Sequence, residues 1–221
     1  MKMRFNPDGP IFRSLSFVAD LVILHFLCLI CCIPVFTIGA AMTALARVTQ
    51  DMVRLQEPGV GRTFFRAFRE NFRQSTVCWL VCLAVGVVVV LDFLLINDVL
   101  TGTAQSVGFL LWVLVTVVYL GVMAWLFPLL ARYEGTLGQH LKNALILALA
   151  KLPRTLIMVA VHALPFVLLL FPVVLSKVII FLAVCGFGLS GYLDARLIAP
   201  VFRNLEGDTG ENGEQEEPEG E

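Results

Sequence analysis

Five ionisable side chains lie inside long apolar stretches of this chain, and they are the first candidates for chemistry. Because a charge in hydrocarbon is costly, such residues commonly mark a ligand, ion or proton path. The alternative for each is a hydrated or snorkelling position at the membrane interface with no shared role, and we favour it for the first and last of them. The five residues are Asp20, His25, Asp92, His162 and Asp194.

The sequence contains no arrangement of residues that is typical of an enzyme. It has no paired carboxylates, no zinc-protease helix, and no nucleophile with a base at usable spacing. Cys28, Cys31 and Cys32 share one helix face, but no histidine or second cysteine pair completes a tetrahedral metal site. We therefore predict a protein that is not an enzyme and that has no cofactor and no metal.

Four arginines form a stripe with helical spacing. Arg62, Arg66, Arg69 and Arg73 recur at intervals that place them within about 60° of one another on a helix. A second stripe of phenylalanines, between residues 64 and 72, is centred about 115° away from them. Two interpretations stay open: an interfacial helix that lies on the inner leaflet, or a docking face for an acidic partner.

Small residues recur four apart in the charge-free run from Leu21 to Ala46. On a helix they form faces on which a second helix backbone can lie close, which is how helices commonly associate in lipid. A proline just before these faces removes a helical N–H and bends the segment. The predicted packing motif consists of Pro34, Thr37, Gly39, Ala40, Thr43 and Ala44.

The composition indicates an all-α integral membrane protein. With 58% hydrophobic residues and a mean hydropathy of +0.87, the chain has too little polar surface to cover a soluble globule. We expect one helix bundle over residues 15–203, with one or two interfacial amphipathic helices, between a polar lead-in (1–14) and a disordered acidic tail (204–221). The five expected spans are 15–46, 76–96, 107–131, 155–175 and 178–200.

The distribution of positive charge predicts the orientation. If the loops 47–75 and 132–154 and the tail are cytoplasmic, twelve of the sixteen Lys and Arg residues lie inside, which places the N-terminus outside and the C-terminus in the cytoplasm. Lys2, Arg4 and Arg13 conflict with this orientation. A re-entrant first segment, broken at Pro34, would place them inside instead.

Several motifs together resemble the YesL family of small bacterial membrane proteins. They are Pro34 to Leu45, the stretch from Phe64 to Phe72, Phe127 to Tyr133, and Pro200-Val201-Phe202. The resemblance covers roughly residues 10–203, and the acidic tail departs from it. It implies a domain of unknown function, found in Gram-positive bacteria and often encoded beside sugar importers of the ATP-binding cassette type. It supplies no catalytic residues.

We therefore expect a multi-pass cell-membrane protein that is a non-catalytic accessory or regulatory partner in carbohydrate uptake. The partners expected are the lipid bilayer, components of a sugar importer and a second copy of the chain, and nothing indicates nucleic acid. A small transporter acting as an oligomer is the alternative, because five spans without an internal repeat need dimerisation to build a symmetric pathway. An intramembrane enzyme is the second alternative.

Overall fold

The chain is all-α in the computed structural model, as expected from the sequence. The structure describes residues 10–54, 59–168 and 172–214, and within them it has α-helices, one short 3-10 helix and no strand. The helices are α1 (Pro10–Cys32), η1 (Val35–Thr37), α2 (Ile38–Val53), α3 (Val60–Val99), α4 (Gly102–Arg132), α5 (Leu137–Ala150), α6 (Leu152–Leu168) and α7 (Pro172–Glu214).

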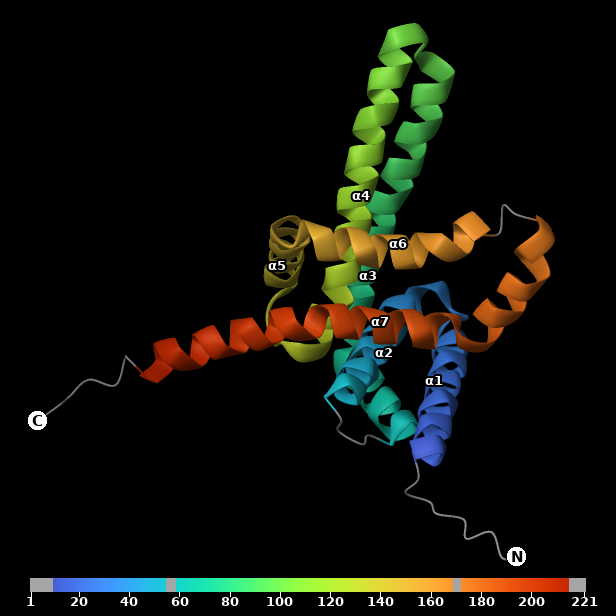
Figure 1. Cartoon of the computed structure of the whole chain (residues 1–221). Coiled ribbons are helices and arrows are strands. Elements are labelled where there is room, and N and C mark those ends of the chain that lie inside the picture. The colour runs from blue at the N-terminus through green and yellow to red at the C-terminus, as the bar shows by residue number, and fades with distance from the viewer. Residues whose placement is uncertain (1–9, 55–58, 169–171, 215–221) are drawn as a thin grey trace, which may run out of the picture.

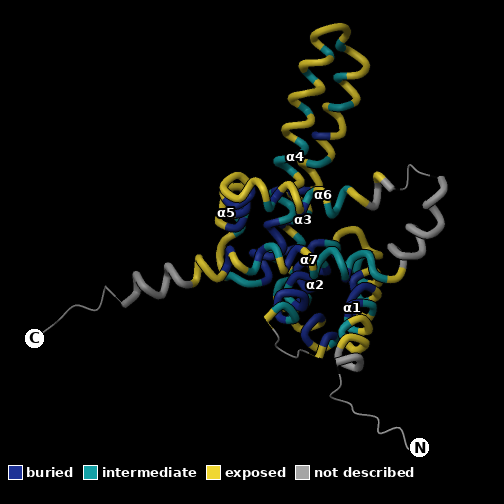
Figure 2. The backbone as a smooth tube through the Cα atoms, viewed as in Figure 1, coloured by how far each residue is buried: buried dark blue, intermediate teal, exposed yellow. Residues whose placement is uncertain are grey.

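Helices α3 and α4 form a long antiparallel hairpin that projects beyond the other helices (Figure 1). Gly102, at the turn, has a φ of 62°, a backbone conformation that side chains with a Cβ rarely adopt. Trp112 Nε1 donates to the Val89 carbonyl at 2.7 Å, and the Tyr119 hydroxyl donates to the Cys82 carbonyl at 2.9 Å. The projecting part is exposed and apolar (Figure 2), as expected of helices that face lipid.

The first expected span, residues 15–46, is not one helix. Helix α1 ends at Cys32, and α2 runs back beside it after the turn at Pro34 (Figure 1). The Thr37 hydroxyl lies 2.5 Å from the Cys31 carbonyl and 2.7 Å from the Pro34 carbonyl, so it satisfies backbone groups that the break exposes. Trp79 Nε1 donates to the Val35 carbonyl at 2.8 Å, which fixes the turn against the middle of α3.

The arginine stripe is not on a separate interfacial helix, because α3 runs without a break from Val60 to Val99. Phe64 is fully buried in a core with Leu24 and Cys28 of α1 and several residues of α2, and Phe68 packs against that core. The side of the aromatic stripe with Phe64 and Phe68 therefore faces protein, since the α1–α2 hairpin folds back over it, whereas Phe65 stays exposed. This arrangement differs from the interfacial interpretation, in which the phenylalanines lie in lipid.

Helices α5 and α6 meet at an angle of 101°, and α6 and α7 cross the α3–α4 hairpin (Figure 1). At this crossing a second core forms around the fully buried Trp125 of α4, with Met158 of α6 and Phe202 of α7. Helix α7 continues to Glu214, so residues 204–214 are helical rather than disordered as the sequence suggested. Glu206, whose contacts with arginines are described below, holds this part of α7 against the rest of the protein.

The structure has three helices that are long and apolar enough to cross a membrane, within the residues it describes. They are Ser14–Cys32, Val60–Val99 and Gly102–Arg132, and α5 with α6 makes a fourth if the bent pair counts as one span. The expected count of five is therefore not confirmed. The last expected span, residues 178–200, lies in α7, where the side chains of residues 172–183 are outside the described part. The conclusion that this is a membrane protein does not depend on that count.

Candidate functional site

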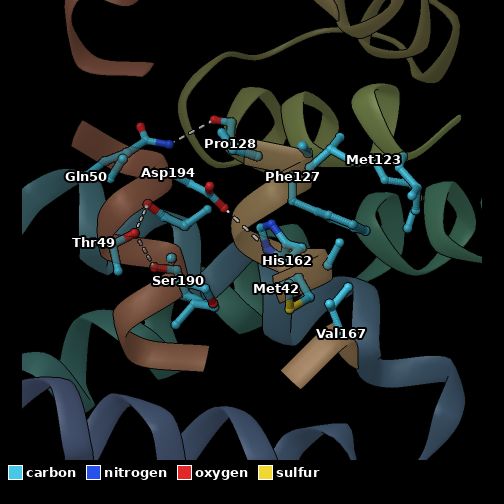
Figure 3. A pocket seen from close by; sticks show the side chains of 18 residues that line it. Met42, Thr49, Gln50, Met123, Phe127, Pro128, His162, Val167, Ser190 and Asp194 are labelled. Atoms are coloured by element: carbon cyan, nitrogen blue, oxygen red, sulfur yellow. Dashed lines mark hydrogen bonds and ion pairs between the residues drawn. The ribbon is translucent and has the colours of Figure 1, made fainter. Parts of the chain in front are cut away.

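Four helices line a partly open cavity of about 520 Å³ at the crossing of α6 and α7 with α2 and α4 (Figure 3). Its wall is almost entirely apolar, with methionine, leucine, phenylalanine and alanine side chains from α2 and α4. A few polar side chains interrupt this wall, which is the usual composition of a small-molecule site. They are Thr49, Gln50, His162, Ser190 and Asp194.

His162 of α6 and Asp194 of α7 point toward one another in this cavity (Figure 3). His162 Nε2 lies 3.4 Å from Asp194 Oδ2, and Asp194 is only 8% exposed. Its second carboxylate oxygen, Oδ1, is buried and has no hydrogen-bond partner among the described residues. The fold thus brings together two of the five ionisable candidates, although they are far apart in the sequence.

The hydrogen bonds of His162 fix where its proton lies. Nδ1 is 2.9 Å from the carbonyl of Met158, and because a carbonyl only accepts, Nδ1 must carry a hydrogen. Nε2 therefore meets Asp194 either as an imidazolium that donates to a carboxylate or as a neutral imidazole that accepts from a carboxylic acid. In either case Nε2 is the ring nitrogen that faces the Asp194 carboxyl group, and the ring can be neutral because Nδ1 already carries a hydrogen.

The two hydroxyl groups in the cavity wall donate their hydrogens within their own helices. The Thr49 hydroxyl donates to the backbone of α2, at 3.0 Å to Leu45 or 3.2 Å to Ala46. The Ser190 hydroxyl donates to the Phe187 carbonyl at 3.2 Å. Each hydroxyl oxygen keeps lone pairs that can still accept. Gln50 Nε2 donates one hydrogen to the Pro128 carbonyl at 3.1 Å and keeps a second one. Around Asp194 the polar side of the cavity therefore offers acceptors, a free carboxylate oxygen and two hydroxyl oxygens, and Gln50 adds one amide donor.

The three other ionisable candidates do not line the cavity. His25 is almost completely buried, and its Nδ1 accepts the backbone N–H of Phe187 at 3.0 Å, which joins α1 to α7. Asp92 is exposed on the projecting part of α3, whereas Asp20 belongs to α1 at the other end of the molecule (Figure 1). The structure therefore does not bring these two aspartates together.

The small-residue motif lies where α2 packs against α3. Thr43 Oγ1 is 2.8 Å from Ser75 Oγ of α3, and the Thr43 hydroxyl also lies 2.9 Å from the Gly39 carbonyl. A Cβ on Gly39 would meet the Ser75 carbonyl oxygen and, at 2.5 Å, the Cβ of Trp79. Ala40 and Ala44 are fully buried. Side chains larger than these do not fit between the two backbones.

The four stripe arginines are all exposed on the first turns of α3. None of them pairs with a carboxylate among the described residues, whereas Arg47, Arg54 and Arg132 all have acidic partners there. Phe65 lies on the same face and is 54% exposed. We call the set Arg62, Phe65, Arg66, Arg69 and Arg73 the arginine face.

A second polar contact, not expected from the sequence, joins the C-terminal ends of α2 and α4 to α7. Glu206 of α7 accepts from Arg132 Nε of α4 at 2.7 Å and from Arg54 after α2 at 3.2 Å. The Arg132 guanidinium also lies 5.1 Å from the centre of the Phe202 ring. The only sequence signals were an arginine that closes an apolar span and the first acid of a tail, which say nothing about pairing.

The N-terminal part of the chain is similar to a known family. Residues 19–93 match a family model described as "Protein of unknown function, DUF624". The match covers about a third of the chain and includes α2, with its small-residue motif, and the arginine face, but not His162 or Asp194. No curated protein and no solved structure matches the chain. The chain is thus similar to a family whose function is unknown.

Proposed function

We propose that this protein is a non-catalytic accessory protein of the bacterial cell membrane that docks on an acidic cytoplasmic surface of a partner membrane protein. The observation that carries the proposal is the arginine face: its arginines are exposed and unpaired among the described residues, while Phe64 of the neighbouring aromatic stripe is buried and Phe68 packs against the same core. A helix whose apolar side is covered by protein has no need to lie flat on lipid.

The length of α3 supports a protein partner over lipid. If residues 76–96 cross the hydrocarbon core, the polar layer of the membrane extends only about 5 to 7 Å further. Arg62 lies eleven residues before Arg73 on the same helix, which is about 16 Å along the axis. With α3 close to the membrane normal, Arg73 lies within the headgroup layer, Arg69 lies at its edge about 10 Å from the core, and Arg62 and Arg66 extend beyond it into the cytoplasm.

The chemistry of the arginine face also suits a protein surface. Guanidinium groups bind carboxylates through two parallel hydrogen bonds, which gives orientation as well as affinity. An exposed phenylalanine among arginines is typical of the residues enriched at interfaces. The resemblance to the YesL family supports a sugar importer component as the partner and carbohydrate uptake as the process. The cavity is the observation that favours the second candidate, a small transporter that acts as an oligomer.

Replacing Arg66 and Arg69 together by lysine is expected to reduce partner binding by roughly a hundredfold, because lysine keeps the charge but loses the forked contact. Attraction to anionic lipid, at about 1 kcal/mol per residue, would tolerate the change. The measurement is the affinity of the purified protein for the importer components that co-purify with it in mild detergent.

Arg154→Lys with Arg203→Lys is the matched control, since both arginines lie outside the arginine face, and it should bind like the wild type. The proposal is wrong if Arg66→Lys with Arg69→Lys retains wild-type affinity, or if the wild-type protein recovers no importer component.

We further propose that both termini lie on the cytoplasmic side. Because α2 runs back beside α1, the start of α1 lies at the same end of the molecule as the start of α3 (Figure 1). This arrangement removes the conflict of Lys2, Arg4 and Arg13 with the positive-inside rule. Under this proposal the N-terminus is cytoplasmic, as in the re-entrant alternative, and not external as first expected.

Labelling of intact cells with a membrane-impermeant thiol reagent tests this orientation in a variant without the native cysteines. A cysteine added before Met1, or one at Glu70, should be protected, and one at Gly102 should react. Reaction of the cysteine before Met1 with protection at Glu70 would restore the original prediction of an external N-terminus.

A further inference from the structure

We propose that the cavity between α2, α4, α6 and α7 binds a lipophilic primary amine in its protonated form, with the ammonium group on Asp194. This site is separate from the arginine face, and the inference does not depend on the docking proposal. It rests on three observations: the size and apolar wall of the cavity, the unpartnered oxygen of Asp194, and a polar side that offers acceptors.

The cavity has the size and wall of a site for a small apolar molecule. Its volume of about 520 Å³ lies in the range of drug-sized ligand pockets, roughly 300 to 1,000 Å³. Side chains such as Met42, Met123 and Phe127 supply the apolar contact (Figure 3). Methionine adapts to irregular apolar shapes, which suits a chain or ring of variable form. The body of the ligand is therefore hydrocarbon.

The hydrogen-bond pattern selects the head of the ligand. Asp194 Oδ1 is buried without a partner among the described residues, and the oxygens of Thr49 and Ser190 can only accept because their hydrogens are used in α2 and α7. An ammonium group has three donors and no acceptor, so it complements this set. A hydroxyl offers one donor and a carboxylate none.

Charge balance then requires that the ligand displace a proton. The bound state without net charge consists of the ammonium, the Asp194 carboxylate and a neutral His162. Any proton that the Asp194 and His162 pair still carried would leave an uncompensated charge in a largely apolar site, which is unfavourable. Binding therefore releases such a proton to solvent, leaving the Asp194 carboxylate paired with the ammonium and His162 as the neutral imidazole.

Among the residues that the structure describes on these four helices, no other titratable side chain lines the cavity. The nearest charged residues along these helices face elsewhere: on α2, Arg47 pairs with Asp51 at 3.4 Å, and on α7, Arg196 lies over the Tyr192 ring. Arg132 of α4 binds Glu206, and Arg154 begins α6 about two turns before His162. The proton balance is thus carried by His162 and Asp194.

Three probes of equal chain length test the site: octylamine, octanol and octanoate. They are added by equilibrium dialysis to the full chain in phosphatidylcholine nanodiscs, with empty nanodiscs as background. Octylamine is expected to bind about tenfold or more tightly than octanol, since the charge-assisted contact to Asp194 is available only to the amine. Octanoate is expected to show no binding above background.

Asp194→Asn should reduce octylamine binding by about tenfold or more and leave octanol unchanged. Asparagine keeps the volume, and its amide can donate to His162 Nε2, so the helices stay joined. Asp92→Asn is the matched control, because Asp92 is also in an apolar helix but outside the cavity. It should bind octylamine like the wild type. A second variant, Ala163→Leu, keeps Asp194 and fills part of the cavity, and it should weaken octylamine and octanol alike.

The displaced proton gives an independent readout. Between about pH 6 and pH 8 octylamine stays protonated, so its affinity should rise with pH by up to about tenfold per unit in the wild type and not in Asp194→Asn. Equal binding of octanol and octylamine would overturn the inference in favour of an apolar filling such as a lipid chain. It would also be overturned if Asp194→Asn or Ala163→Leu bound octylamine like the wild type, or if the wild type bound no probe.

Discussion

Gly39→Leu is expected to remove most of the folded protein from the membrane. Even the first carbon of the new side chain would meet the Ser75 carbonyl oxygen and the Trp79 Cβ of α3, and neither is the end of a flexible side chain. Overpacking of this kind commonly costs about 1 to 3 kcal/mol, and a leucine against backbone belongs at or above the upper end. The whole free energy of unfolding of a domain is only about 5 to 15 kcal/mol.

The measurement is the amount of folded protein and its thermal unfolding in mild detergent. Gly61→Ala and Gly138→Ala are matched controls in helices, since nothing lies within 4 Å of the added Cβ at either position. Alanine favours a helix by up to about 1 kcal/mol over glycine, so these controls should be neutral or slightly stabilising. Wild-type unfolding for Gly39→Leu would show that α2 and α3 do not pack this closely.

Trp125→Ala has the second large expected effect, a loss of about 3 to 5 kcal/mol in the free energy of unfolding. Trp125 is fully buried where α4 meets α6 and α7, and its Nε1 donates to the Thr155 hydroxyl at 2.9 Å. The Phe202 ring lies 6.5 Å away, centre to centre. Truncation leaves a void between three helices, and this void can close only if the packing of the helices is rearranged.

Trp112→Ala is the control for this prediction, because Trp112 is on the same helix and also donates one hydrogen bond from Nε1. It lies in the projecting hairpin and is only partly buried, so lipid can fill the space it leaves. Thermal unfolding of the two variants in the same detergent gives the comparison. If both lose the same stability, the crossing of α4, α6 and α7 is not the core of the fold.

Local features of the fold could be predicted from the sequence. The helical class follows from the long apolar stretches, and a bend at Pro34 follows from its missing N–H. The small residues at Gly39 and Thr43 indicate close helix packing without saying which helix is the partner. In the structure that partner is α3, and the contact exists because α2 turns back after the break.

Features that depend on the path of the chain could not be predicted. The aromatic stripe at Phe64 has the spacing of a lipid-facing surface, and only the return of α1 and α2 makes it a protein core. His162 and Asp194 were both candidates, but their pairing depends on the crossing of α6 and α7. The contact of Glu206 with Arg132 joins α7 to the last residue of α4, more than seventy residues earlier, for which no local pattern exists.

The unbroken helix α3 also has a mechanical consequence. Its 40 residues span about 60 Å, and Ser75, which contacts Thr43 of α2, divides this length into arms of about 22 Å and 36 Å. If α3 tilts as a rigid rod, Ser75 is the point about which it pivots. A partner that tilts the short arm, which carries the arginine face, would move the far end of the hairpin in the opposite direction by about one and a half times as much. Helix α4, which supplies one wall of the cavity, is tied to the long arm and would follow it.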